Sequence, residues 1–106
     1  MNIEQKAQEL ARIIKNSEEF KTMNKYKREI EKKKNIKRQL DAYLSKKDKI
    51  YTRYKINEAN RKINELDQEY SKVFQTPLVE NYFKSTQRFN LLMQTVYKTI
   101  EQELLR

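Results

Sequence analysis

Apolar side chains recur along this chain at spacings of three and four residues. In the first segment they fall on one stripe of an α-helix, formed by Ile3, Ala7, Leu10, Ala11 and Ile14. Ser17, followed by Glu18 and Glu19, is typical of a helix N-cap with acidic residues in the first turn, where they interact favourably with the helix dipole. The pattern therefore predicts one helix over residues 3–15 and a second over 17–33.

The apolar stripe of the second helix loses its phase after Ile30. The next apolar residue, Ile36, lies six positions further on, which is about 240° around a helix. Asn35 is a residue type that often caps a helix N-terminus, so we predict that a third helix begins at Ile36. One continuous helix with a twisted stripe is the alternative.

The segment 36–54 has the most regular pattern in the chain. Its stripe is heptad-like and consists of Ile36, Leu40, Tyr43, Lys47, Ile50 and Tyr54. After a turn in which Asn57 is the predicted cap, the segment 58–74 repeats the spacing with Ala59, Ile63, Leu66, Tyr70 and Val73. Two matched seams joined by a short connection predict a helical hairpin.

Thr76 and Pro77 mark the clearest break, because threonine can cap a helix and proline suits the first helical position. The last predicted helix, 77–105, has the widest apolar stripe. We therefore predict one all-α domain over residues 1–106, a multi-helix bundle with long antiparallel helices. We expect it to be dimeric, because a chain of this length buries too little apolar surface alone. The predicted oligomer or partner interface comprises Leu40, Tyr43, Ile50, Tyr54, Tyr82, Phe83, Phe89 and Met93.

Composition argues against catalysis. The 106 residues include no Gly, no Cys and no His. The chain therefore lacks the usual residue of phosphate-binding loops, the thiolate nucleophile, the common proton shuttle and the common transition-metal ligands. We predict a protein that is not an enzyme, with no catalytic, metal-binding or cofactor-binding residues and no small-molecule substrate.

No apolar run approaches the roughly 20 residues of a membrane-spanning helix. The first residues also lack the basic and apolar regions of a secretory signal. We expect a cytoplasmic protein without a membrane span.

The net charge of +9 is concentrated in the first part of the chain. Residues 1–62 hold 19 Lys and Arg against 9 Asp and Glu, whereas residues 63–106 hold 5 against 6. Within the basic stretch Lys21–Arg38, the predicted contact face comprises Lys32, Lys33, Lys34, Lys37 and Arg38. An RNA-binding adaptor that uses this stretch is the alternative function. A solvated or protein-facing surface is favoured, because 17 of the 24 cations are lysine, which lacks the bidentate fork of arginine.

Three further stretches carry a family resemblance. They read IIKNSEEF at 13–20, FQTPLVENYF at 74–83 and FNLLMQTV at 89–96, with the apolar segment 36–43 between the first two. In this order they resemble the YlbF/YmcA family of small bacterial helical proteins, and the similarity spans nearly the whole chain.

The resemblance implies an all-helical regulatory or scaffold protein that acts through protein–protein contacts, as a homodimer or in a hetero-complex with related helical proteins. It further implies a complex that modulates ribonuclease-dependent mRNA processing and development, including biofilm formation, competence and sporulation. Some relatives hold an iron–sulfur cluster through cysteines. That feature is not carried over, because this chain has no cysteine.

Overall fold

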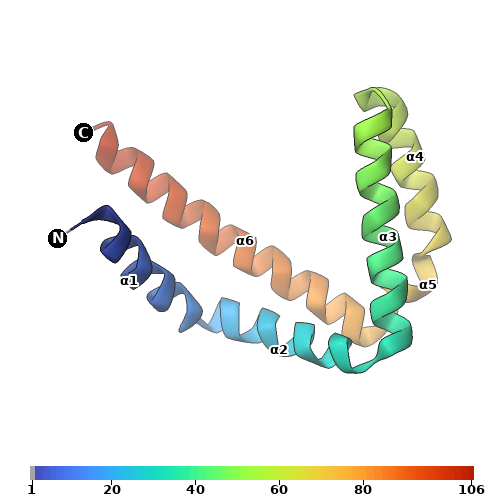
Figure 1. Cartoon of the computed structure of the whole chain (residues 1–106), viewed down its shortest axis with the longest axis horizontal. Helices are drawn as coiled ribbons and strands as arrows, with labels where there is room; N and C mark the ends of the chain where they lie inside the picture. Colours follow the sequence, from blue (N-terminus) through green and yellow to red (C-terminus); the bar gives the residue numbers. More distant parts are fainter. Residues whose placement is uncertain (1) are drawn as a thin grey trace. The chain divides into compact units, whose positions relative to one another are not determined.

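The computed structural model describes residues 2–106 and is helical almost throughout (Figure 1). Its helices in this range are α1 (Ile3–Lys15), α2 (Glu18–Lys32), α3 (Lys34–Arg53), α4 (Ile56–Glu69), α5 (Ser71–Phe74) and α6 (Pro77–Leu104). No strand occurs among residues 2–106, and none of these residues has a positive φ angle. The prediction of an all-α, multi-helix fold is confirmed.

The helices group into two compact units. Unit 1 comprises the chain up to Lys27 together with Asn81–Arg106, and unit 2 comprises Arg28–Glu80. The chain passes from unit 1 to unit 2 within α2 and returns within α6. The single domain over residues 1–106 stays a prediction.

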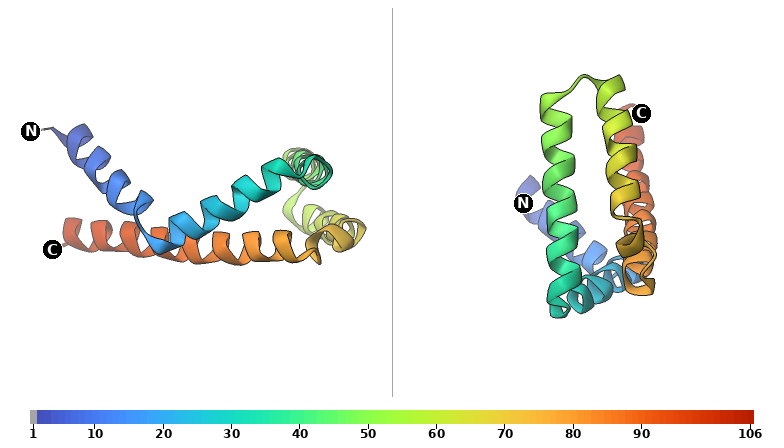
Figure 2. Two further views of the ribbon diagram at one scale, coloured as in Figure 1. Left: turned by 90° about the horizontal axis from the view of Figure 1, so that it is seen from below. Right: turned by 90° about the vertical axis from the view of Figure 1, so that its right-hand side faces the viewer.

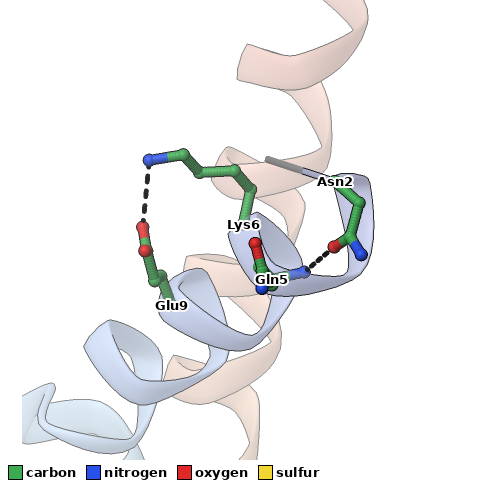
Figure 3. Close-up of polar contacts among 4 residues, drawn as sticks. All are labelled: Asn2, Gln5, Lys6 and Glu9. Atoms are coloured by element: carbon green, nitrogen blue, oxygen red, sulfur yellow. Dashed lines mark hydrogen bonds and ion pairs between the residues drawn. The ribbon is translucent and has the colours of Figure 1, made fainter.

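Side-chain caps define the beginnings of α1 and α2. The Asn2 side chain accepts a hydrogen bond from the backbone N–H of Gln5 at 2.8 Å (Figure 3). The hydroxyl of Ser17 accepts from the backbone N–H of Phe20 at 3.1 Å and donates to the carbonyl of Ile14 at 2.6 Å. These bonds confirm Ser17 as the N-cap of α2, because they satisfy a backbone donor that the helix itself leaves without a partner.

α2 and α3 are separate helices, which excludes the alternative of one continuous helix. Lys33 interrupts them with φ −101° and ψ 90°. Because α3 begins at Lys34, the predicted cap Asn35 lies inside its first turn, and Asn57 likewise lies inside the first turn of α4. Both cap predictions are wrong for the same reason. The N-cap position is occupied by a lysine, Lys33 before α3 and Lys55 before α4, and lysine has no capping preference.

In unit 2, α3 and α4 form an antiparallel hairpin, which is seen side by side in Figure 1 and in the right-hand view of Figure 2. Tyr54 and Lys55 connect the two helices. The hairpin core consists of Tyr43, Ile63 and Leu66, each less than a tenth exposed. The two heptad-like seams predicted from the sequence therefore supply the residues that the hairpin buries.

Tyr43 contacts two further aromatic rings of unit 2 and one carboxylate. Its ring lies 5.6 Å from that of Tyr70, in a stacked arrangement, and 4.7 Å from that of Phe74. Its hydroxyl donates a hydrogen bond to the carboxylate of Asp67. Burial, reinforced by this carboxylate, raises the pKa of Tyr43. Phe74 belongs to the short α5, which is separate from α4. The prediction of one helix over residues 58–74 is therefore wrong. The apolar stripe continues through the break, so the sequence pattern does not indicate it.

In unit 1, α2 contacts α6 through an edge-to-face pair of rings, Phe20 and Phe89, whose centroids lie 5.7 Å apart. α1 is packed more loosely, and none of its residues is buried. The apolar stripe of α1 is therefore only partly covered within unit 1.

Candidate interaction surfaces

The first candidate surface is an apolar groove in unit 1 with a volume of about 480 Å³. It is lined by Asn2, Ile3, Lys6, Ala7 and Leu10 of the α1 region and by Ile100 of α6, and we call it the α1–α6 groove. Lys6 is the one charged residue of the lining, and it forms an ion pair with Glu9 at 3.2 Å (Figure 3). The groove therefore combines an apolar lining with little net charge.

Several large apolar side chains of unit 1 are exposed, and two of them, Ile3 and Ile100, line this groove. Ile3 is 87% exposed, Leu104 79% and Ile100 45%. Others in unit 1 that are more than half exposed are Ile13, Leu91, Tyr97 and Leu105. Burial of exposed apolar surface is favourable by roughly 25 cal/mol per Å². Contiguous patches of such surface usually mark a contact site.

The second candidate surface is a groove of about 350 Å³ between the two helices of the hairpin in unit 2. Its lining consists of Lys46, Lys49, Ile50, Arg53, Tyr54, Lys62, Glu65, Leu66 and Glu69, and we call it the α3–α4 groove. Residues on each helix recur at spacings of three and four, so they share one helical face. The groove therefore runs between one face of α3 and one face of α4.

At one end of the α3–α4 groove the charges are paired. The ammonium of Lys46 lies 3.5 Å from the carboxylate of Glu69 and 5.1 Å from the ring centre of Tyr70. A hydrogen bond with the Tyr70 hydroxyl, together with the negative charge of Glu69, raises the pKa of Lys46. Both partners of the ion pair are half exposed or more, so the pair contributes little to stability.

Elsewhere in the α3–α4 groove, charges lack a partner of opposite sign. The ammonium of Lys62 lies 4.7 Å from the ring centre of Tyr54. Lys49 and Arg53 on α3, and Glu65 on α4, form no ion pair within residues 2–106. These three side chains are therefore available to a molecule that enters the groove.

The predicted basic contact face lies where α2 ends and α3 begins. Its five residues are all exposed: Lys32, Lys33, Lys34, Lys37 and Arg38. Lys37 forms an ion pair with Asp41 at 2.8 Å, and this carboxylate raises the pKa of Lys37. The cations are accessible, and their contact with RNA stays a prediction.

The structure divides the eight predicted interface residues between the two units. In unit 2, Leu40 and Tyr43 are buried at 8% and 7% exposure, whereas Ile50 and Tyr54 line the α3–α4 groove. In unit 1, the remaining four are half-buried: Tyr82, Phe83, Phe89 and Met93. We leave Leu40 and Tyr43 out of the proposed surfaces, because side chains already packed within the chain have little area to offer a partner.

The residues predicted from the sequence include none that line the α1–α6 groove, and only Ile50 and Tyr54 of those that line the α3–α4 groove. Periodicity places Leu10 and Ile100 on apolar stripes, but it does not show which stripes the same chain covers. The sequence does contain one indication of the α3–α4 groove. Lys46, Lys49 and Arg53 are spaced by three and four residues, which places three cations on one face of α3.

No group of three or more Asp, Glu, His or Cys side chains suited to holding a metal ion occurs within residues 2–106. In the same part of the chain, no helix has both the length and the apolar character needed to cross a membrane. Fold and surfaces together define an all-α protein of the multi-helix class, with a groove in each unit and exposed apolar side chains in unit 1.

The particular family follows from a comparison with family models. The model described as control of competence regulator ComK, YlbF/YmcA, matches residues 3–104. The chain therefore belongs to the YlbF/YmcA family, and the resemblance noted in the sequence is confirmed. Comparisons with curated proteins and with solved structures gave no match. Membership fits a regulatory role and suggests protein partners.

Proposed function

We propose that this protein is a non-enzymatic regulator that acts in the cytoplasm by binding other proteins, including a second copy of itself. The observation that carries the proposal is the exposed apolar surface at the α1–α6 groove. The description of the family as control of a competence regulator supports the regulatory part. In our proposal the assembly includes related helical proteins and modulates ribonuclease-dependent mRNA processing, and with it competence, biofilm formation and sporulation.

The α1–α6 groove suits a second copy of the chain. A symmetric contact uses the same surface on both partners, so unpaired charge on that surface would oppose it. The groove avoids this, because its one charged lining residue, Lys6, is paired with Glu9. Burial of an exposed side chain such as Ile3 or Leu104 contributes roughly 1.5 to 3 kcal/mol. Several such side chains buried on each copy would offset the cost of association, which is roughly 4 to 15 kcal/mol.

The regulatory role is tested in a strain of the source organism that lacks this protein. We expect reduced expression of competence genes, restored by the wild-type chain but not by a chain with Leu10→Lys and Ile100→Lys. The matched control, Gln8→Lys with Gln94→Lys, adds the same charge at exposed positions of the same helices and should restore expression. Unchanged expression in the deletion strain would contradict the regulatory role, and full rescue by the groove variant would contradict the role of the groove.

An RNA-binding adaptor is the second candidate function, favoured by the exposure of all five cations of the basic contact face. Phosphate contacts release counterions, so the logarithm of the affinity falls with the logarithm of the salt concentration, by roughly 0.7 per phosphate on a single strand. On this candidate, Lys33→Glu, Lys34→Glu and Lys37→Glu together weaken binding of a single-stranded RNA and flatten its salt dependence. Titration at several salt concentrations measures both, and unchanged affinity would exclude the basic contact face.

A further inference from the structure

The α3–α4 groove has two walls of different charge over an apolar floor. The α3 wall carries three cations, Lys46, Lys49 and Arg53. The α4 wall carries both acidic residues of the groove, Glu65 and Glu69, beside Lys62. Ile50 and Leu66 lie between the walls and pack with the hairpin core, so the floor is apolar and already formed.

Some of the charged side chains in this groove are paired with each other, and others have no ion-pair partner within residues 2–106. Lys46 and Glu69 neutralise each other across one end of the groove. Lys49 and Arg53 on one wall and Glu65 on the other have no ion-pair partner within residues 2–106. The groove therefore offers two cations on one side and one carboxylate on the other to whatever occupies it.

We propose that the α3–α4 groove docks one amphipathic helix of a partner protein. The helix presents acidic side chains to Lys49 and Arg53, a basic side chain to Glu65 and an apolar stripe to the floor. The wall residues recur at three- and four-residue spacing, which is the arrangement that accepts a third helix in coiled-coil packing, with flanking charges that select the partner. This inference rests on the proposed function, because it names the kind of partner that the regulator binds.

The other macromolecules fit the groove less well. The phosphates of a nucleic acid would lie beside Glu65 and Glu69, and the ring of Tyr54, which could stack on a base, is occupied by the ammonium of Lys62. A second copy of this hairpin is opposed by charge, because unit 2 holds 14 Lys and Arg against 9 Asp and Glu. A helix with acidic residues on one flank and basic residues on the other avoids both conflicts.

Three synthetic helical peptides of about three heptads test the proposal against the full chain. All share one apolar stripe. The split peptide has glutamates on one flank and lysines on the other, the glutamate peptide has glutamates on both, and the lysine peptide has lysines on both. Fluorescence anisotropy measures each dissociation constant, and we expect the split peptide to bind most tightly and the lysine peptide most weakly.

Charge reversal in the chain then locates the site. Lys49→Glu with Arg53→Glu should weaken binding of the split peptide by about tenfold, because two attractive contacts become repulsive. The matched control, Arg12→Glu with Lys15→Glu, makes the same charge change at two exposed positions of α1, outside both the groove lining and the basic contact face, and should leave the affinity within about twofold. Circular dichroism checks that both variants stay helical.

The proposal is overturned if the groove variant binds the split peptide as the wild type does. It is also overturned if the lysine or glutamate peptide binds as tightly as the split peptide, or if a single-stranded RNA displaces it. Failure of this docking site is distinguishable from failure of the proposed function. Peptide binding depends on unit 2, whereas self-association depends on the α1–α6 groove in unit 1, so each can be lost while the other is retained.

Discussion

Replacing Tyr43 with alanine lowers the free energy of unfolding by about 3 to 5 kcal/mol, the range found when a buried aromatic side chain is truncated. The change removes the ring contacts with Tyr70 and Phe74 and leaves the carboxylate of Asp67 without its hydroxyl donor. Urea denaturation followed by circular dichroism measures the loss.

The adjacent residue supplies the control for this prediction. Leu44 is 59% exposed on the same helix, so Leu44→Ala should change the free energy of unfolding by no more than about 0.5 kcal/mol. A loss for Tyr43→Ala that is no larger than the loss for Leu44→Ala would show that Tyr43 does not hold the hairpin together.

The Tyr43 hydroxyl also makes this core sensitive to alkaline pH. Its pKa is raised in the fold by burial and by Asp67, so above the ordinary tyrosine pKa of about 10 the unfolded chain loses a proton that the folded chain keeps. The free energy of unfolding therefore falls above about pH 10, by up to roughly 1.4 kcal/mol per pH unit from this group. Tyr43→Phe keeps the ring but has no hydroxyl, so it should show a smaller fall in the free energy of unfolding at alkaline pH. Measuring the free energy of unfolding of both chains at about pH 8 and about pH 11 tests this. Equal losses in both chains would contradict the assignment.

Two lysines placed in the α1–α6 groove abolish self-association. In Leu10→Lys with Ile100→Lys, each new ammonium would be buried at the contact without a partner, and desolvation of one such charge costs several kcal/mol. We therefore expect the dissociation constant to rise by at least about a hundredfold. The fold should be retained, because Leu10 is only partly buried and Ile100 is 45% exposed in the single chain.

The same control pair separates this effect from added charge alone. Gln8→Lys with Gln94→Lys should associate like the wild type, because neither position lines the groove. Equal weakening by both pairs would mean that net charge, and not the groove, governs association.

The sequence predicts helices well where an apolar stripe and a strong boundary signal coincide. Ser17 combines a capping hydroxyl with two following acidic residues, and the structure has its hydrogen bond to the Phe20 N–H. Pro77 likewise begins α6. At Lys33 and Lys55 the helices are interrupted by residues without a capping side chain, so the nearby asparagines misled the placement of both boundaries.

The candidate surfaces were harder to predict for a different physical reason. A stripe at helical spacing shows that one face of a helix is apolar, but the burial of that face depends on contacts between distant segments. Tyr43 and Tyr54 lie on one stripe, yet the structure buries Tyr43 in the hairpin core and leaves Tyr54 more than a third exposed. The stripe of α1 is as regular as the others, and none of its residues is buried.

The molar mass of the wild-type chain in solution tests most directly whether the α1–α6 groove of unit 1 is an association surface. Light scattering and sedimentation across the micromolar range should give a mass of at least twice the 13.0 kDa of the chain, falling toward 13.0 kDa on dilution. The Leu10→Lys, Ile100→Lys variant should stay at 13.0 kDa throughout. A wild-type mass of 13.0 kDa at every concentration would contradict the account.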